Sequence, residues 1–192
     1  YKSAIMNQSQ IIELQRRIDT APDGYWGPKS IAACQRHLKA LMPIGGVWPS
    51  PEDGAMVRFF GRPGNESRLI SLDVTGLGVK YDGQAVRSIR CHELVAESLG
   101  RILRRISEGP HRGILAKYAG CYNPRSMRGG KRPSKHSWGA AIDLDPDHNG
   151  LKTSWPVAAT MPIEVMEEFA REGWIGLGWQ IGRDSMHFQP TR

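Results

Sequence analysis

Two short segments of this chain carry residue types that together can bind a metal and hydrolyse a bond. The first runs from Ser134 to Asp143 and contains His136, and the second contains Asp184 and His187. Two neutral imidazoles and one carboxylate are a ligand set of catalytic zinc, because they leave the fourth tetrahedral position to a water whose pKa the metal lowers. The pattern therefore predicts a zinc-dependent hydrolase with His136, Asp143 and His187 as metal ligands.

The remaining carboxylate, Asp184, is the candidate general base. A carboxylate beside a metal-activated water can take its proton and pass it to the leaving amine. In a regular strand Asp184 and His187 face opposite ways, so this role requires a turn or bulge near Gly182 and Arg183. The hypothesis therefore depends on local geometry as well as on residue type.

Two further side chains near the first segment are candidates for a role in the site. The guanidinium of Arg125 is suited to hold a substrate carboxylate through paired hydrogen bonds, or to stabilise a tetrahedral oxyanion. A solvated basic loop is an equally good interpretation of Arg125, because further Arg and Lys residues follow it closely. Ser134 is either a functional residue or an ordinary turn or capping serine.

The hydrophobic pattern predicts short helices and short strands around these segments. Apolar residues at helical spacing predict helices at residues 11–18, 31–41, 91–106 and 162–171. Strands are expected at residues 69–74, 79–81, 140–144 and 186–189. In the third of these strands the period of two places Asp143 on the face opposite Ile142 and Leu144, which offers a carboxylate to a cleft. Gly139, just before that strand, permits a close approach of backbone.

Composition and charge limit the class of protein. The 192 residues include 40% hydrophobic and 23% charged residues, which is ordinary for a globular chain and excludes a disordered or fibrous one. No apolar run approaches the roughly 18 residues of a membrane span, so we expect no stable membrane insertion. The net charge of +7 favours an anionic partner, such as a nucleic acid, an acidic membrane surface or a cell-wall polymer. The three cysteines form no C-x-x-C pair, so we expect them to be reduced and structural.

Several conspicuous residues have simple interpretations. The stretch that begins at Asp145 matches the first half of a calcium-binding loop, but Pro156 stands where that loop needs a bidentate glutamate, so an acidic turn is favoured. Trp138, Trp174 and Trp179 either line a substrate cleft or fill the core, and the core is favoured. No basic stripe with interleaved aromatic residues is visible, so a nucleic-acid partner is not expected.

The N-terminal segment carries a motif of its own. Leu14-Gln15 is followed by the pattern D-G-x-W-G-P from Asp23 to Pro28. This pattern resembles the small helical peptidoglycan-binding domain of many wall hydrolases, over residues 7–42. For single residues such as Trp26 a structural role is favoured, because the glycines of the motif permit a tight turn. Proline and glycine then accumulate before residue 54, as in a linker. We expect a helical module at residues 1–43, a linker at 44–52 and a catalytic domain at 53–192.

The two segments with the candidate ligands fit a family pattern as well. Residues 134–143 read S-x-H-x-x-G-x-A-x-D, and residues 184–188 read D-x-M-H-F. The pair resembles the M15 family of zinc D,D-carboxypeptidases and L-alanyl-D-glutamate endopeptidases, over residues 53–190. Residues 60–64, 91–93 and 120–125 resemble the modular phage endolysins of that family.

The resemblance implies an α+β fold of the hedgehog/D,D-peptidase type, preceded by the small all-α module. The implied activity is hydrolysis of a peptide bond in the wall stem peptide by zinc-activated water. The L-Ala–D-Glu endopeptidase activity is favoured over the D-Ala–D-Ala carboxypeptidase activity. The resemblance also implies roles for the site residues: His136, Asp143 and His187 as zinc ligands, Asp184 as base, Arg125 as substrate-facing arginine and Ser134 as supporting serine.

One alternative belongs to another class of protein. A related fold can retain zinc as a structural element in a non-catalytic wall-binding module, but such a site has no need of a base, so Asp184 favours the enzyme. The first residues lack the apolar region of a secretory signal. This fits the resemblance to phage endolysins, which implies synthesis in the cytoplasm of a bacterial host without a signal peptide and action on the cell wall during lysis. We expect a monomer whose partner is peptidoglycan.

Overall fold

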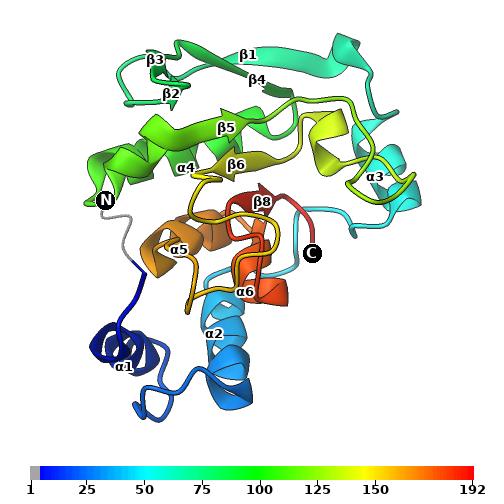
Figure 1. Cartoon of the computed structure of the whole chain (residues 1–192). Coiled ribbons are helices and arrows are strands. Elements are labelled where there is room, and N and C mark those ends of the chain that lie inside the picture. Colours follow the sequence, from blue (N-terminus) through cyan, green and yellow to red (C-terminus); the bar gives the residue numbers. More distant parts are fainter. Residues whose placement is uncertain (1–4) are drawn as a thin grey trace.

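The computed structural model describes residues 5–192 and combines helices with small antiparallel sheets (Figure 1). The α-helices are α1 (Gln8–Arg17), α2 (Pro28–Ala40), α3 (Asp53–Phe60), α4 (Ala96–Glu108), α5 (Ile163–Arg171) and α6 (Leu177–Ile181), with 3-10 turns η1 (Glu66–Arg68), η2 (Arg112–Lys117) and η3 (Lys135–Trp138). The strands are β1 (Leu69–Asp73), β2 (Lys80–Tyr81), β3 (Gln84–Ala85), β4 (Ser88–His92), β5 (Tyr118–Gly120), β6 (Ile142–Leu144), β7 (Ile175–Gly176) and β8 (His187–Gln189). This mixture agrees with the predicted α+β class. Across residues 5–192, no helix has both the length and the apolar character needed to cross a membrane.

The sheet that carries the candidate site has the strand order β5-β6-β8-β7. Its central pair, β6 and β8, is antiparallel, and Asp143 lies directly opposite His187. On the other side of β6, Gly120 of β5 lies opposite Asp143. The pairing of strands that are distant in the chain therefore brings two of the predicted metal ligands into register.

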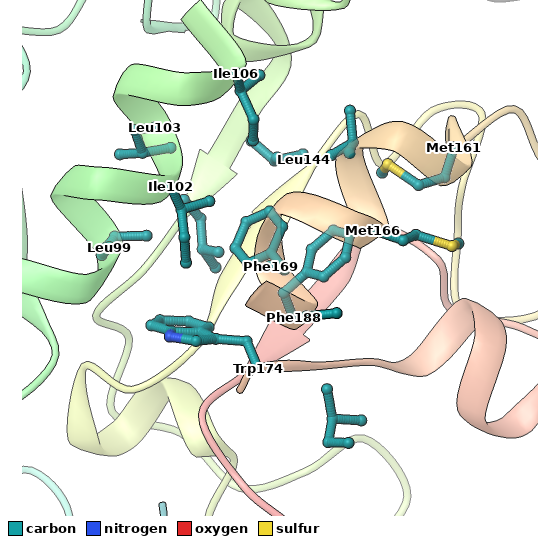
Figure 2. Close-up of a cluster of buried hydrophobic side chains, with 14 of the residues drawn as sticks. Leu99, Ile102, Leu103, Ile106, Leu144, Met161, Met166, Phe169, Trp174 and Phe188 are labelled. Carbon is teal, nitrogen blue, oxygen red and sulfur yellow. The ribbon is translucent and has the colours of Figure 1, made fainter. Parts of the chain in front are cut away.

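A hydrophobic core beneath this sheet anchors β8 (Figure 2). The ring of Phe169 in α5 stacks on that of Phe188 in β8, with centroids 3.9 Å apart and planes 9° from parallel. Trp174 packs against Phe169 and donates its indole N–H to Ser98 Oγ at 2.9 Å. Full burial of a phenylalanine side chain, as at Phe169 and Phe188, stabilises the fold by roughly 1.5–3 kcal/mol. Because Phe188 directly follows His187, this packing also holds the imidazole in place.

The helix predicted over residues 91–106 begins later, at Ala96, and that part of the prediction was wrong. Cys91 belongs to β4 instead. This strand pairs with β1 and buries Ile89 and Cys91 on one face. Leu94, expected on the inner side of the helix, is 43% exposed. The error arose because inward residues of a strand, followed by a turn, can imitate helical spacing over a few positions.

The N-terminal motif is organised by the side chain of Gln15. Its Nε2 donates to Asp23 Oδ1 at 2.9 Å, to the Tyr25 carbonyl at 2.9 Å and to Ser30 Oγ at 3.0 Å. Its Oε1 accepts the backbone N–H of Gly24 at 2.8 Å. Gln15 is fully buried, so each polar atom of its amide is satisfied inside the protein. The glutamine and the D-G turn of the motif are therefore structural partners that join α1 to α2.

Gly139 allows the segment before β6 to lie against β4. It has a left-handed φ of +66°, and its carbonyl accepts the N–H of His92 at 3.0 Å. A Cβ added here would lie 2.8 Å from the backbone nitrogen of His92 and 2.8 Å from Leu69 Cδ2. The close approach of backbone that the sequence predicted at Gly139 is confirmed.

Replacement Gly139→Ala is expected to lower the free energy of unfolding much more than Gly129→Ala. Both glycines have a positive φ, +66° and +77°, so each alanine loses about 1–2 kcal/mol to backbone strain. Only Gly139 also meets neighbouring backbone, which adds about 1–3 kcal/mol of overpacking. Urea denaturation of the two variants measures the difference, and equal losses of stability would contradict this account.

Candidate metal centre

The side chains of His136, Asp143 and His187 converge on one point. Nε2 of His136 lies 3.1 Å from Asp143 Oδ2, and Nδ1 of His187 lies 3.1 Å from Asp143 Oδ1. One donor atom from each residue falls within 4.8 Å of the other two, and no other such trio of His, Cys, Asp or Glu is found in the described part of the chain. The structure thus brings together the ligands that the sequence predicted, in a geometry compatible with a metal ion.

Hydrogen bonds from outside the cluster determine which ring nitrogen of each histidine faces it. Nδ1 of His136 lies 2.7 Å from the Cys121 carbonyl oxygen, and Nε2 of His187 lies 2.9 Å from Gln189 Oε1. Gln189 is itself oriented, because its Nε2 donates to Thr191 Oγ1 at 2.9 Å. Since both acceptors are oxygens, the outer nitrogens carry protons. Each inner nitrogen therefore either holds a further proton against Asp143 or, once that proton is lost, offers a lone pair to a metal. Nε2 of His136 is buried and, apart from its contact with Asp143, has no hydrogen-bond partner within residues 5–192, as expected of a metal ligand.

The electrostatics of the cluster favour a cation. Burial raises the pKa of Asp143, but hydrogen bonds from His136 and His187 outweigh this and hold the pKa well below its usual range. Burial lowers the pKa of His187, but the hydrogen bond to Asp143 dominates and raises it. An ionised carboxylate is therefore held between two imidazoles. A metal bound there would replace a proton, so we expect its affinity to fall at low pH.

Ser134 positions the first of these ligands. It is the N-cap of η3, and its hydroxyl accepts the backbone N–H of His136 at 3.4 Å. Gly139 ends the turn in the left-handed conformation. Ser134 is 5% exposed and lines the cavity above the cluster. The structure thus shows the capping role that the sequence offered as the ordinary interpretation, at a place next to the site.

Asp184 reaches the same cavity from a turn that precedes β8. Gly182 and Asp184 both have left-handed φ values, +78° and +57°, and the N–H of His187 donates to the Asp184 carbonyl at 3.1 Å. The role proposed for Asp184 required a turn of this kind, because in a regular strand the side chains of Asp184 and His187 would face opposite ways. Oδ1 of Asp184 is buried without a hydrogen-bond partner in the part of the chain described, and burial is the main cause that raises its pKa. A carboxylate with an unpaired oxygen therefore lies beside the cluster of candidate ligands.

The acidic stretch after β6 supports this turn. The side-chain oxygen of Asn149 accepts the N–H of Met161 at 2.7 Å and the hydroxyl of Ser185 at 3.1 Å. Asp145 is fully buried and accepts from Nδ1 of His148 at 2.8 Å. The acidic stretch thus forms a turn whose Asp145 and Asn149 side chains make contacts inside the protein. The role of Asn149 was missed, because its partners are distant in the chain.

Two cavities, of about 510 and 490 Å³, meet at the cluster. Both are lined by Arg125, Arg128, His136 and Asp143. The first also contains the residues Ser134, Leu151, Leu177, Ile181, Asp184 and Gln189, and the second contains Tyr81, Arg90, Tyr118 and Tyr122. The candidate ligands therefore lie where the two cavities meet, and they can be reached from both cavities.

Arg125 lies at the junction of these cavities with its backbone fixed. The hydroxyl of Ser137 accepts the N–H of Arg125 at 3.0 Å and donates to its carbonyl at 2.8 Å. Its Nη1 donates to the Ser126 carbonyl at 3.3 Å, and the side chain remains exposed. Ser137 could not be singled out from the sequence, because it stands at a free position of the S-x-H-x-x-G pattern. Gln189 had a detectable signal, because it lies two residues after His187 on the same strand.

The tryptophans considered for the cleft belong to the core. Trp138 is 2% exposed, Trp174 is 0% exposed and Trp179 is 3% exposed. The indole N–H of Trp138 donates to the Gly61 carbonyl at 2.8 Å. The interpretation of these residues as core side chains is confirmed.

A comparison with known families covers the C-terminal third of the chain. Residues 128–190 match a family model of the M15 peptidases that is described as D-alanyl-D-alanine carboxypeptidase. This segment resembles an M15 peptidase. The M15-like segment contains His136, Asp143, Asp184 and His187, whereas Arg125 lies before it. The match supports a hydrolase of the metallopeptidase class, and it is consistent with a cell-wall substrate. No curated protein and no solved structure matches the chain.

The variant Gln189→Leu is expected to weaken zinc binding by about 10- to 100-fold. It removes the acceptor that fixes the tautomer of His187 but leaves the three candidate ligands in place. Competition with a chromophoric chelator measures the affinity, and Gln84→Leu, at an exposed position in β3, is the matched control. An unchanged affinity in Gln189→Leu would show that the outer hydrogen bond does not tune the site.

Proposed function

We propose that this chain is a zinc peptidase that hydrolyses a peptide bond in the stem peptide of bacterial peptidoglycan. The observation that carries the proposal is the His136–Asp143–His187 cluster, with the unpaired carboxylate of Asp184 in the same cavity. Two imidazoles and one carboxylate fit zinc and leave a coordination position open. A purely structural site has no use for a buried base without a partner.

The residues of the site divide the chemistry among them. His136, Asp143 and His187 would hold the zinc ion, which would supply Lewis-acid chemistry that activates the attacking water. Asp184 takes a proton from the attacking water on its free Oδ1 and delivers it to the nitrogen of the leaving amine. The carbonyl carbon gains the hydroxyl as its bond to nitrogen breaks. Arg125, at the junction of the cavities, binds a substrate carboxylate or the developing oxyanion.

The shape of the site favours an endopeptidase. An endopeptidase binds chain on both sides of the scissile bond, whereas a carboxypeptidase needs room for only one residue beyond it. The cluster lies where two cavities of similar size meet, so an extended peptide can pass across it in both directions. We therefore propose cleavage of the L-Ala–D-Glu bond, with D-Ala–D-Ala carboxypeptidase activity as the alternative.

The proposal extends to the biological setting. The net charge of +7 favours retention on the anionic wall, which raises the local concentration of substrate. The motif that joins α1 to α2 resembles a peptidoglycan-binding domain, which makes the chain a modular endolysin of phage type. In this role a monomer accumulates in the host cytoplasm and reaches the wall during lysis.

Digestion of purified muropeptides tests the reaction and the bond together. The zinc-loaded protein is expected to separate L-Ala from D-Glu, which mass spectrometry detects as fragments with a new amino terminus at D-Glu. Asp184→Asn, which keeps the size of the side chain, is expected to retain zinc and to lose about 100-fold or more in kcat.

Each outcome of this experiment has a distinct meaning. Release of terminal D-Ala alone would replace the endopeptidase by the carboxypeptidase. Full activity in Asp184→Asn would remove Asp184 from the mechanism. Zinc binding without any hydrolysis of muropeptides would favour the non-catalytic wall-binding module.

A further inference from the structure

The N-terminal helices are docked on α5 through an ion pair between a half-exposed arginine and a buried glutamate. Nε and Nη2 of Arg17 donate to the two carboxylate oxygens of Glu167 at 2.8 and 2.7 Å. Nε2 of His37 lies 2.8 Å from the same carboxylate, whose side chain is only 5% exposed. A buried carboxylate that loses its partners is strongly destabilising. These contacts therefore fix α1 and α2 in one position on α5.

Apolar packing continues across the same interface. Figure 1 shows α1 and α2 next to α5 and α6, on the side of the molecule away from β1 and β4. One continuous cluster of buried side chains joins the two regions, and it includes Leu14, Ile18, Cys34, Leu38, Phe169, Trp179 and Phe188. The helices and the sheet that carries the site thus share a core.

Two contacts from the N-terminal region reach the chain just before Asp184. Nε2 of Gln35 in α2 donates to the carbonyl of Gln180 in α6 at 3.2 Å. The ring of Trp26 packs edge-on against that of Trp155, with centroids 5.5 Å apart and an angle of 86°. The backbone N–H of Trp155 in turn donates to the Gly182 carbonyl at 2.9 Å. Both contacts therefore act on residues 180–182, next to the turn that carries the candidate base.

Helix α6 is packed so closely against the residues around Asp184 that the two have little room to move independently. Leu177 and Ile181 form part of the wall of the first cavity, and Asp184 lies in the same cavity. Inside α6, a Cβ added to Gly178 would lie 2.5 Å from the Cβ of Ser185, so the helix presses on the residue after Asp184. In packing this close, a shift of α6 displaces its neighbours.

We propose that Trp26 and Gln35 are positioning residues of the active site, which hold α6 and the Asp184 turn in the geometry that hydrolysis requires. The inference rests on the proposed function. In this arrangement the N-terminal helices contribute to catalysis directly, in addition to any contact with the wall. Wall binding near these helices then has a physical route to the site, through Trp155 and α6.

Soluble substrate separates positioning from tethering. A module that only binds the wall raises the rate on insoluble peptidoglycan and has no effect on a short stem peptide in solution. A positioning contact changes kcat on the short peptide, because small misplacements of a catalytic group reduce the rate strongly. The test therefore uses the full chain loaded with zinc and a soluble stem peptide that contains the scissile bond.

The variants are Trp26→Ala, Trp26→Phe and Gln35→Ala, with Lys39→Ala on the exposed side of α2 as the control. In Trp26→Ala we expect kcat to fall about tenfold, with KM changed by less than about twofold. Gln35→Ala should show a smaller fall in kcat, and Trp26→Phe should recover most of the rate because an aromatic edge is restored. Zinc content and the kinetics of Lys39→Ala should match those of the wild type.

Hydrogen exchange supplies a readout that does not depend on activity. In Trp26→Ala and Gln35→Ala the amides of residues 177–184 should exchange faster, while those of β6 and β8 stay protected. If both variants bind zinc and keep the kcat and the amide exchange rates of the wild type, the inference is overturned. It also fails if exchange rises equally throughout the chain, because the contacts then serve general stability. If Trp26→Ala does not fold, Gln35→Ala decides by the same criteria. A wild-type protein inactive on the soluble peptide would overturn the proposed function instead.

Discussion

The site depends on one carboxylate held between two imidazoles. Asp143 on β6 lies opposite His187 on β8, and η3 carries His136 to the same point. An ionised carboxylate in a largely buried place is unfavourable unless positive charge or hydrogen bonds surround it. The cluster meets that need with two ring nitrogens, each 3.1 Å from a carboxylate oxygen. When these nitrogens lose their protons, the same nitrogens and the carboxylate can bind a cation instead.

The surrounding elements can be understood as supports of this cluster. The stacked rings of Phe169 and Phe188 hold β8, and Gly139 permits the close approach that places η3 beside β4. Cys121 and Gln189 orient the imidazoles from outside. Asp184 is positioned separately, by a turn that contains two left-handed residues. A hydrogen bond from Ser185 to Asn149 connects this turn to the loop after β6. The candidate metal ligands and the candidate base are thus held by different parts of the fold.

Much of the site could be predicted from the sequence, because its residue types and their pattern are distinctive. The three candidate ligands were predicted from residue type, spacing and the resemblance to the M15 family, and strand periodicity correctly placed Asp143 on the face opposite the buried Ile142 and Leu144. The helix expected to begin at Cys91 was wrong, since β4 imitates helical spacing over its last residues. Gln189 was overlooked although it lies two residues after His187 on the same strand. The supports Ser137 and Asn149 were missed because their roles arise from contacts that only the folded chain creates. The same holds for the position of Trp26 against Trp155.

Diffraction data from crystals grown with zinc, collected on both sides of the zinc absorption edge, test the central claim most directly. This account predicts one strong anomalous peak per chain. The peak should lie about 2.0–2.2 Å from Nε2 of His136, from a carboxylate oxygen of Asp143 and from Nδ1 of His187. Oδ1 of Asp184 should lie near the open coordination position. Absence of a peak at this cluster, or a zinc ion bound through the opposite ring nitrogens, would contradict the account.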